Sequence, residues 1–87
     1  MKNKVLFLTI PGCHNCEAAK EIFTEIMPEF ADTVEVEEID MSTPEGQEMA
    51  GRYSVMASPG IVINEELFST GGVNKEELVA KLKSLSE

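Results

Sequence analysis

The chain has 87 residues, of which 43% are hydrophobic, and its formal net charge is −9. We expect one folded domain over residues 1–87, because compact domains usually contain about 100–150 residues and this composition can supply a packed core. The negative charge disfavours binding to nucleic acid, whose phosphates it repels.

The N-terminal segment MKNKVLFLTIP joins two lysines to an apolar run, but it is not expected to be a secretory signal. Pro11 interrupts the run, and no small-residue cleavage site follows it. No stretch of the sequence approaches the roughly 20 apolar residues that span a bilayer. We therefore expect no membrane association and a cytoplasmic location, where a permanent structural disulfide is uncommon.

The first half of the chain alternates between patterns typical of strands and of helices. The apolar run 5–10 predicts a strand that is buried on both faces, and Pro11-Gly12 ends it. Apolar residues within 19–27 recur at helical spacing and predict an amphipathic helix that is kinked or ended near Pro28. Residues 34–39 alternate as a half-exposed strand does.

A second helix is predicted over residues 42–52. Ser42 is expected to cap it, with Glu45 completing a capping box and a proline in the first turn. Gly46 and Gly51 make this helix a weak one.

The last third of the chain predicts two strands and a helix. Residues 60–63 and 67–69 are the strands, joined by a turn at 64–66, and Gly71-Gly72 breaks the chain. Asn74 is expected to cap the final helix. The resulting order is β-α-β-α-β-β-α, with the first two strands parallel and the final hairpin antiparallel.

Both cysteines of the chain, Cys13 and Cys16, lie where the first strand gives way to the first helix. Residues three apart on a helical turn have Cβ atoms about 5–6 Å apart, so this pair can form a disulfide. The ring encloses only two residues, so opening it costs the fold little. The helix N-terminus favours a thiolate at Cys13, whereas Cys16 lies one turn further in and points toward the core. We predict Cys13 as the nucleophile and Cys16 as the resolving thiol of thiol–disulfide exchange.

Other interpretations of this motif stay open. As an imidazolium, His14 could tune the redox pair by stabilising the Cys13 thiolate, or it could be an exposed loop residue. Two thiolates cannot fill a tetrahedral metal site, so zinc or an iron–sulfur cluster would require a second chain and a metal-bridged dimer. We favour a redox-active Cys13–Cys16 disulfide with no metal and no external cofactor.

The CxxC pair, together with Ser58-Pro59 and Gly71-Gly72 further along, resembles the thioredoxin fold over essentially the whole chain. The resemblance implies an α/β fold with a single mixed four-stranded sheet flanked by helices. It also implies that Pro59 is cis and packs beside the cysteines, and that the backbone of Ser58 is free to pair with a substrate chain. The substrate site that the resemblance implies consists of Pro11, Gly12, Ser58, Pro59, Gly71 and Gly72.

The sequence also departs from the thioredoxin pattern. The chain is closer in size to glutaredoxins, and it lacks the tryptophan that precedes the first cysteine of thioredoxins. Phe7 stands in place of their buried aspartate, six residues before that cysteine. The proton acceptor for the resolving thiol must therefore be water, His14 or a group of the partner.

An apolar rim around Cys13 has four candidates in the sequence, which are Met56, Ala57, Gly60 and Phe68. Apolar residues that flank strands are usually buried, so we predict plain core packing for Met56 and Phe68.

The resemblance implies a monomeric dithiol–disulfide oxidoreductase that acts on protein disulfides, and the cytoplasmic context favours a reductase. An upstream flavin- or ferredoxin-linked reductase would restore its dithiol. Glutathione is possible but less favoured, because it is anionic and Glu65 and Glu66 are expected on the pocket side, where basic groups are scarce. The alternatives are a glutaredoxin-like protein that uses glutathione and the metal-bridged dimer.

Overall fold

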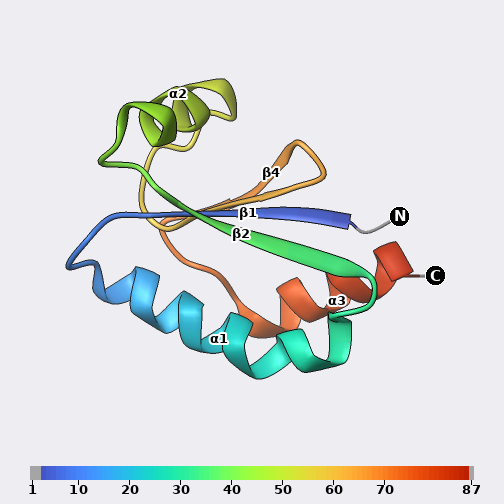
Figure 1. The fold of residues 1–87 in the computed structure, drawn as a ribbon. Helices are drawn as coiled ribbons and strands as arrows, with labels where there is room; N and C mark the ends of the chain where they lie inside the picture. The colour runs from blue at the N-terminus through green and yellow to red at the C-terminus, as the bar shows by residue number, and fades with distance from the viewer. Residues whose placement is uncertain (1–2, 87) are drawn as a thin grey trace.

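The computed structural model describes residues 3–86, so residues 1, 2 and 87 of the predicted domain lie outside the described part. Four strands and three helices follow in the predicted order (Figure 1). Their bounds are β1 Asn3–Thr9, α1 His14–Phe30, β2 Val34–Asp40, α2 Pro44–Arg52, β3 Gly60–Ile63, β4 Glu66–Thr70 and α3 Lys75–Ser86.

The strands form a single mixed sheet in the order β2-β1-β3-β4. β1 pairs with β2 in parallel, whereas the β1–β3 and β3–β4 pairs are antiparallel. Helices α1 and α3 cover one face of this sheet, and α2 covers the other (Figure 1). The predicted fold class, with one mixed four-stranded sheet flanked by helices, is confirmed.

The two faces of β1 pack into two separate hydrophobic clusters. Val5 and Phe7 belong to the larger cluster beneath α1 and α3, where the Phe7 and Phe23 rings lie 5.0 Å apart. Leu6 and Leu8 belong to the smaller cluster, against which side chains of α2 pack. Because successive side chains of a strand point to opposite faces, a strand buried on both faces is apolar at every position.

Pro28 does not itself end α1, although the helix ends two residues after it. The helix continues through it to Phe30. Pro28 lies on the exposed side, whereas Ile26 and Phe30 on either side of it are buried in the larger core cluster. Burial of these two side chains holds the last turn in helical conformation and offsets the hydrogen bond that a proline cannot donate.

The predicted cap of α2 is also wrong by one residue. Thr43 is the N-cap, and its hydroxyl accepts a hydrogen bond from the Gly46 N–H at 3.0 Å. Ser42 instead donates its N–H and its hydroxyl to Asp40 Oδ1, at 2.8 and 2.6 Å. The carboxylate at the end of β2 thus engages Ser42, and Glu45 does not form the predicted capping box.

Met56 was predicted to pack in the core, but it is 88% exposed. The loop that carries it turns through Ser54, whose φ is 61°, and sends the neighbouring Val55 into the smaller cluster instead. Phe68 does pack, partly buried, against the larger cluster.

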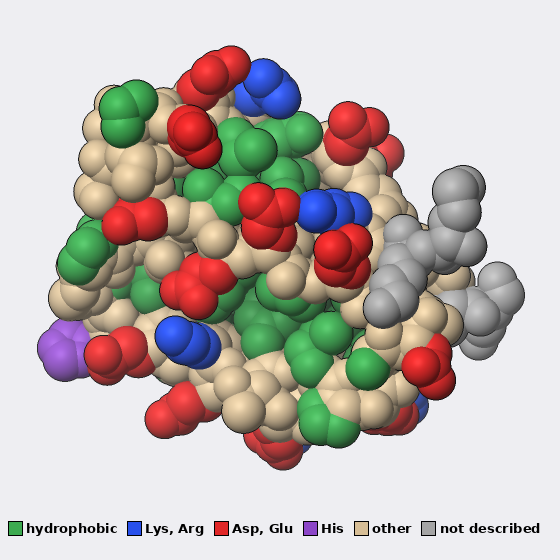
Figure 2. All heavy atoms as spheres, viewed as in Figure 1, with side chains coloured by type: hydrophobic (Ala, Val, Ile, Leu, Met, Phe, Trp, Pro, Cys, Tyr) green, Lys and Arg blue, Asp and Glu red, His purple; other side chains and the backbone are tan. Residues whose placement is uncertain are grey.

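The chain has many more acidic than basic side chains. On the face seen in Figure 2, the charged side chains surround patches of exposed hydrophobic atoms. In the part of the chain that the structure describes, no helix is both long enough and apolar enough to cross a bilayer.

Candidate active site

The two cysteines lie at the N-terminal end of α1, directly after β1. Gly12 takes a left-handed conformation, with φ 75°, in the turn between the two elements. Cys13 is the N-cap of α1, and its sulfur accepts a hydrogen bond from the Cys16 N–H at 3.0 Å. Cys13 is half-buried and Cys16 is 5% exposed, and both are free thiols.

The surroundings of the two sulfurs shift their pKa values in opposite directions. The pKa of Cys13 is lowered, first by the hydrogen bond from the Cys16 thiol and then by the Ser58 hydroxyl. The pKa of Cys16 is raised, mainly because burial disfavours its thiolate and secondly because of the hydrogen bond to Cys13. The two directions agree with the predicted asymmetry of the pair.

A cis peptide bond joins Ser58 to Pro59 at the start of β3, as the resemblance implied. Pro59 is fully buried, and the Ser58 hydroxyl lies 3.5 Å from Cys13 Sγ. Cys13 and Ser58 are 45 positions apart in the sequence, so no local pattern indicates this side-chain contact, and the resemblance implied a role only for the backbone of Ser58.

The glycine pair lies on the same side, although only one of the two glycines is tied to the site. Gly71 donates its N–H to the Pro59 carbonyl at 2.9 Å and accepts a hydrogen bond from Asn15 Nδ2 at 3.3 Å. Gly72 instead accepts a hydrogen bond from the hydroxyl of Ser69. The side chain of Asn15 therefore links α1 to the loop after β4 by a hydrogen bond, and no local pattern in the sequence predicts this role.

A groove of about 480 Å³ opens on another side of the cysteines. Its walls combine the end of β1 and the loop after it, the first turns of α1 and the end of β2. The residues that line it are Thr9, Ile10, Pro11, Gly12, Cys13, Cys16, Glu17, Lys20, Glu38 and Asp40. The predicted residues Pro11 and Gly12 thus share this groove with both cysteines, whereas Lys20 and Glu38 were not foreseen.

Glu65 and Glu66 do not lie on the pocket side, so this prediction is wrong. The turn that carries them follows β3 at the start of β1, where Asn64 exchanges hydrogen bonds with the backbone of Lys4 at 2.8 and 2.9 Å. The cysteines follow the opposite end of β1. The reason is that β3 runs antiparallel to β1, so the C-terminal end of β3 lies far from the cysteines.

His14 is the first residue of α1, and its side chain is exposed. Within residues 3–86, no group of three or more His, Cys, Asp or Glu side chains is arranged to hold a metal ion.

We expect Ser58→Ala to reduce the reactivity of Cys13 toward iodoacetamide at neutral pH. Loss of the hydroxyl removes a hydrogen bond that lowers the pKa of Cys13, so the thiolate fraction should fall about threefold to tenfold. The measurement is the alkylation rate as a function of pH, followed by mass spectrometry. Its inflection should lie below the free-cysteine value of about 8.5 in the unmodified protein and move upward in the variant. Ser84→Ala on α3 is the control, and an equal shift in both variants would contradict this assignment.

This site and this fold define a class of protein, the thioredoxin-fold thiol–disulfide exchange proteins. Residues 1–84 match the family model described as thioredoxin domain. The chain is 40% identical over 82 residues to the thioredoxin of Methanocaldococcus jannaschii, an alignment that covers 94% of each chain. It is 37% identical over 75 residues to the probable thioredoxin of Methanothermobacter marburgensis, with 86% of each chain covered.

Among solved structures, the oxidized form of mitochondrial thioredoxin 3 from Saccharomyces cerevisiae aligns with a TM-score of 0.78. The alignment covers 95% of this chain and 78% of that one at 21% identity, a likeness of fold alone. The chain belongs to the thioredoxin domain family and is a thiol–disulfide oxidoreductase. Proteins of this family act on protein disulfides, and their redox group is an intrinsic cysteine pair.

Proposed function

We propose that this protein is a protein-disulfide reductase in which Cys13 is the nucleophile and Cys16 the resolving thiol. The observation that carries the proposal is the asymmetry of the pair. Cys13 is accessible and its pKa is lowered, whereas Cys16 is buried and its pKa is raised. A thiolate reacts with a disulfide and a thiol does not, so a substrate meets Cys13 first.

The reaction takes two exchange steps. The Cys13 thiolate attacks one sulfur of the substrate disulfide, which forms a mixed disulfide and releases the other substrate sulfur as a thiolate. Cys16 then loses its proton and attacks Cys13 Sγ, which closes the Cys13–Cys16 disulfide and releases the second substrate thiolate. The substrate disulfide gains two electrons, and the Cys13–Cys16 dithiol loses two electrons as it becomes a disulfide.

The substrate is proposed to lie along Ser58 and Pro59 in extended conformation, with the backbone of Ser58 pairing with it. Two contacts support this arrangement. The Ser58 hydroxyl lies beside Cys13 Sγ, and the Gly71 N–H donates a hydrogen bond to the Pro59 carbonyl. Of the predicted substrate-binding residues, Pro11 and Gly12 would contribute from the groove side, and Gly72 through the turn that it makes with Gly71. Met56 is exposed two residues before Ser58, and it offers a flexible apolar contact to varied proteins.

We further propose a monomeric, cytoplasmic reductase, built as one domain, whose dithiol is restored by a flavin- or ferredoxin-linked enzyme. Glutathione is a weaker candidate as reductant or substrate, because three carboxylates line the groove beside a single lysine. His14 remains a predicted tuning residue on the strength of its place next to Cys13.

The test is a redox titration of the cysteine pair, combined with the reduction of insulin by the reduced protein. We expect one insulin disulfide to be reduced for each chain oxidised, and a midpoint potential near −270 mV, typical of a general reductant. A midpoint near −120 mV would make the protein an oxidant instead. Elemental analysis and a native mass of the freshly purified protein address the metal-bridged dimer, which would carry zinc or iron at twice the chain mass.

A further inference from the structure

The resolving step needs a base, because Cys16 must lose its proton before it can attack Cys13 Sγ. Burial raises the pKa of the Cys16 thiol, so little thiolate forms unaided at neutral pH. The side chain of Phe7, on the strand beneath the helix, is buried and apolar and cannot accept a proton.

We propose that Glu38 accepts the proton of the Cys16 thiol, through water in the groove that both residues line, and so acts as the base of the resolving step. The proposal rests on the proposed roles of the two cysteines. In the reverse direction, when a reductase opens the Cys13–Cys16 disulfide, the protonated Glu38 returns this proton to the departing Cys16 thiolate.

Strand pairing brings Glu38 to the correct face of the sheet. Glu38 is paired in register with Phe7 of the parallel neighbour β1, so both side chains point toward the face that α1 covers. The carboxylate of Glu38 therefore lies one strand away from Phe7, on the face of the sheet that α1 covers. Two residues further along β1, the buried Thr9 donates its hydroxyl to Glu38 Oε2 at 3.5 Å.

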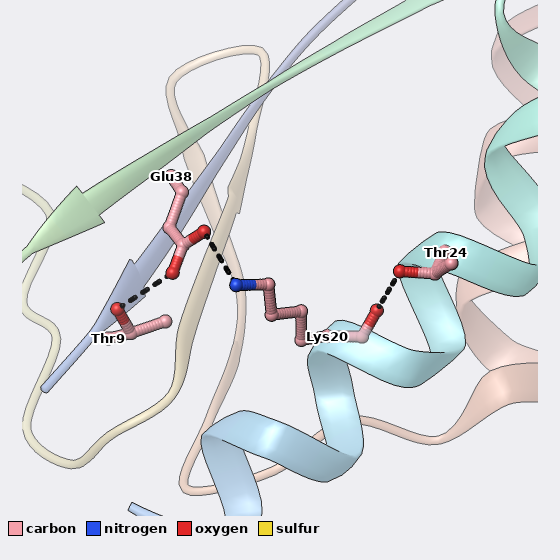
Figure 3. Close-up of polar contacts among 4 residues, drawn as sticks. All are labelled: Thr9, Lys20, Thr24 and Glu38. Carbon is pink, nitrogen blue, oxygen red and sulfur yellow. Dashed lines mark hydrogen bonds and ion pairs between the residues drawn. The ribbon is translucent and has the colours of Figure 1, made fainter. Parts of the chain in front are cut away.

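Helix α1 supplies the second contact. Lys20 lies one turn after Cys16, and its Nζ is 3.6 Å from Glu38 Oε1. Figure 3 shows the carboxylate between the hydroxyl of Thr9 and the ammonium of Lys20. Both partners are exposed, so the ion pair contributes little to stability, and we assign it an orienting role.

The other charged groups of the groove are less suited to the task. The charged residues on its walls are Glu17 and Lys20 from α1 and Glu38 and Asp40 from β2. Lys20 is a cation and cannot accept a proton. Glu17 follows Cys16 directly on the helix, and adjacent helical residues do not face each other. The hydrogen bonds from Ser42 engage Asp40 Oδ1 and lower the pKa of Asp40, which makes it a weak base.

The test follows the two exchange steps separately with 5,5′-dithiobis(2-nitrobenzoate), a disulfide that releases a coloured thiolate in each step. Attack by Cys13 releases the first equivalent, and attack by Cys16 on the mixed disulfide releases the second. We expect Glu38→Gln to leave the first phase unchanged and to slow the second about 100-fold at neutral pH, at the lower end of the range for general-base catalysis. The second-phase rates of the variant and the parent protein should converge once the pH exceeds the pKa of Cys16, because the thiolate then forms without help.

Glu37→Gln is the matched control. Glu37 is the adjacent residue on β2, points to the opposite face, and also forms an ion pair with a lysine, Lys4, at 2.9 Å. The Glu37→Gln variant should leave both phases unchanged, although it changes the net charge by the same amount as Glu38→Gln does. A second phase that is unchanged or faster in Glu38→Gln would overturn the proposal, since removal of a nearby negative charge by itself favours the Cys16 thiolate. Equal slowing by both variants would overturn it as well.

The same traces distinguish this failure from failure of the proposed function. If the parent protein shows two phases and Cys16→Ser only the first, the roles of the two cysteines stand whatever Glu38→Gln does. If the parent protein itself releases no second equivalent, the resolving role of Cys16 is wrong, and the role of Glu38 falls with it.

Discussion

Cys16→Ser is expected to stop the reaction at the mixed disulfide, so that the variant remains covalently attached to its substrate. Cys13 keeps the Ser58 contact that favours its thiolate, and the first exchange should still occur. Release then depends on an external thiol, and turnover should fall about 10³-fold or more, because an intramolecular nucleophile acts at a far higher effective concentration. Intact-mass measurement of the complex with insulin, before and after addition of dithiothreitol, reveals the trapped species.

Cys13→Ser is the matched control for this experiment. It should neither form a complex nor reduce insulin, because the remaining thiol of Cys16 is buried and its pKa is raised. If Cys13→Ser traps the substrate and Cys16→Ser does not, the two roles are reversed.

Gly46→Ala is expected to destabilise the protein strongly, although alanine is the better helix former. A Cβ on Gly46 would lie 2.0 Å from the backbone oxygen of Asp40, at the end of β2, and neither backbone can move without disturbing the capped start of α2. We expect the free energy of unfolding to fall by about 3 kcal/mol, at the upper end of the usual range for overpacking. The melting temperature should drop by more than about 10 °C, measured by circular dichroism.

Gly51→Ala, in the same helix, provides the opposite expectation. A Cβ at Gly51 meets no atom within 4 Å, so the variant should gain about 0.5–1 kcal/mol from the lower chain entropy of alanine. Similar changes in melting temperature for the two variants would contradict the close approach of β2 to α2 at Gly46.

The two glycines illustrate how far local reasoning extends in this protein. Both weaken α2 in a count of helix propensity, and the sequence offers no reason to treat them differently. Only the packing of α2 against the end of β2 separates them. The cap of the same helix shows a similar limit, since Ser42 and Thr43 are both good caps, and the position of Asp40 decides between them.

Other features required no tertiary information. The final helix is capped as predicted, with the Glu77 N–H donating to Asn74 Oδ1 at 3.0 Å. Cys13 lies at the N-terminus of α1 and Cys16 on its buried side, because the strand, the Pro11-Gly12 turn and the helical period are all encoded within a few residues.

The sequence by itself determined the order of the seven elements, the inward and outward faces of the helices and the asymmetry of the cysteine pair, since these depend on short-range periodicity and capping. Tertiary structure alone decided which distant side chains reach the sulfurs. Ser58 meets Cys13 because β3 runs antiparallel beside β1, and Glu38 reaches the groove because β2 is paired with β1 in one register. The physical reason is that a one-residue shift of a strand turns every side chain to the other face, and the pairing that fixes the register joins segments that are far apart in the chain.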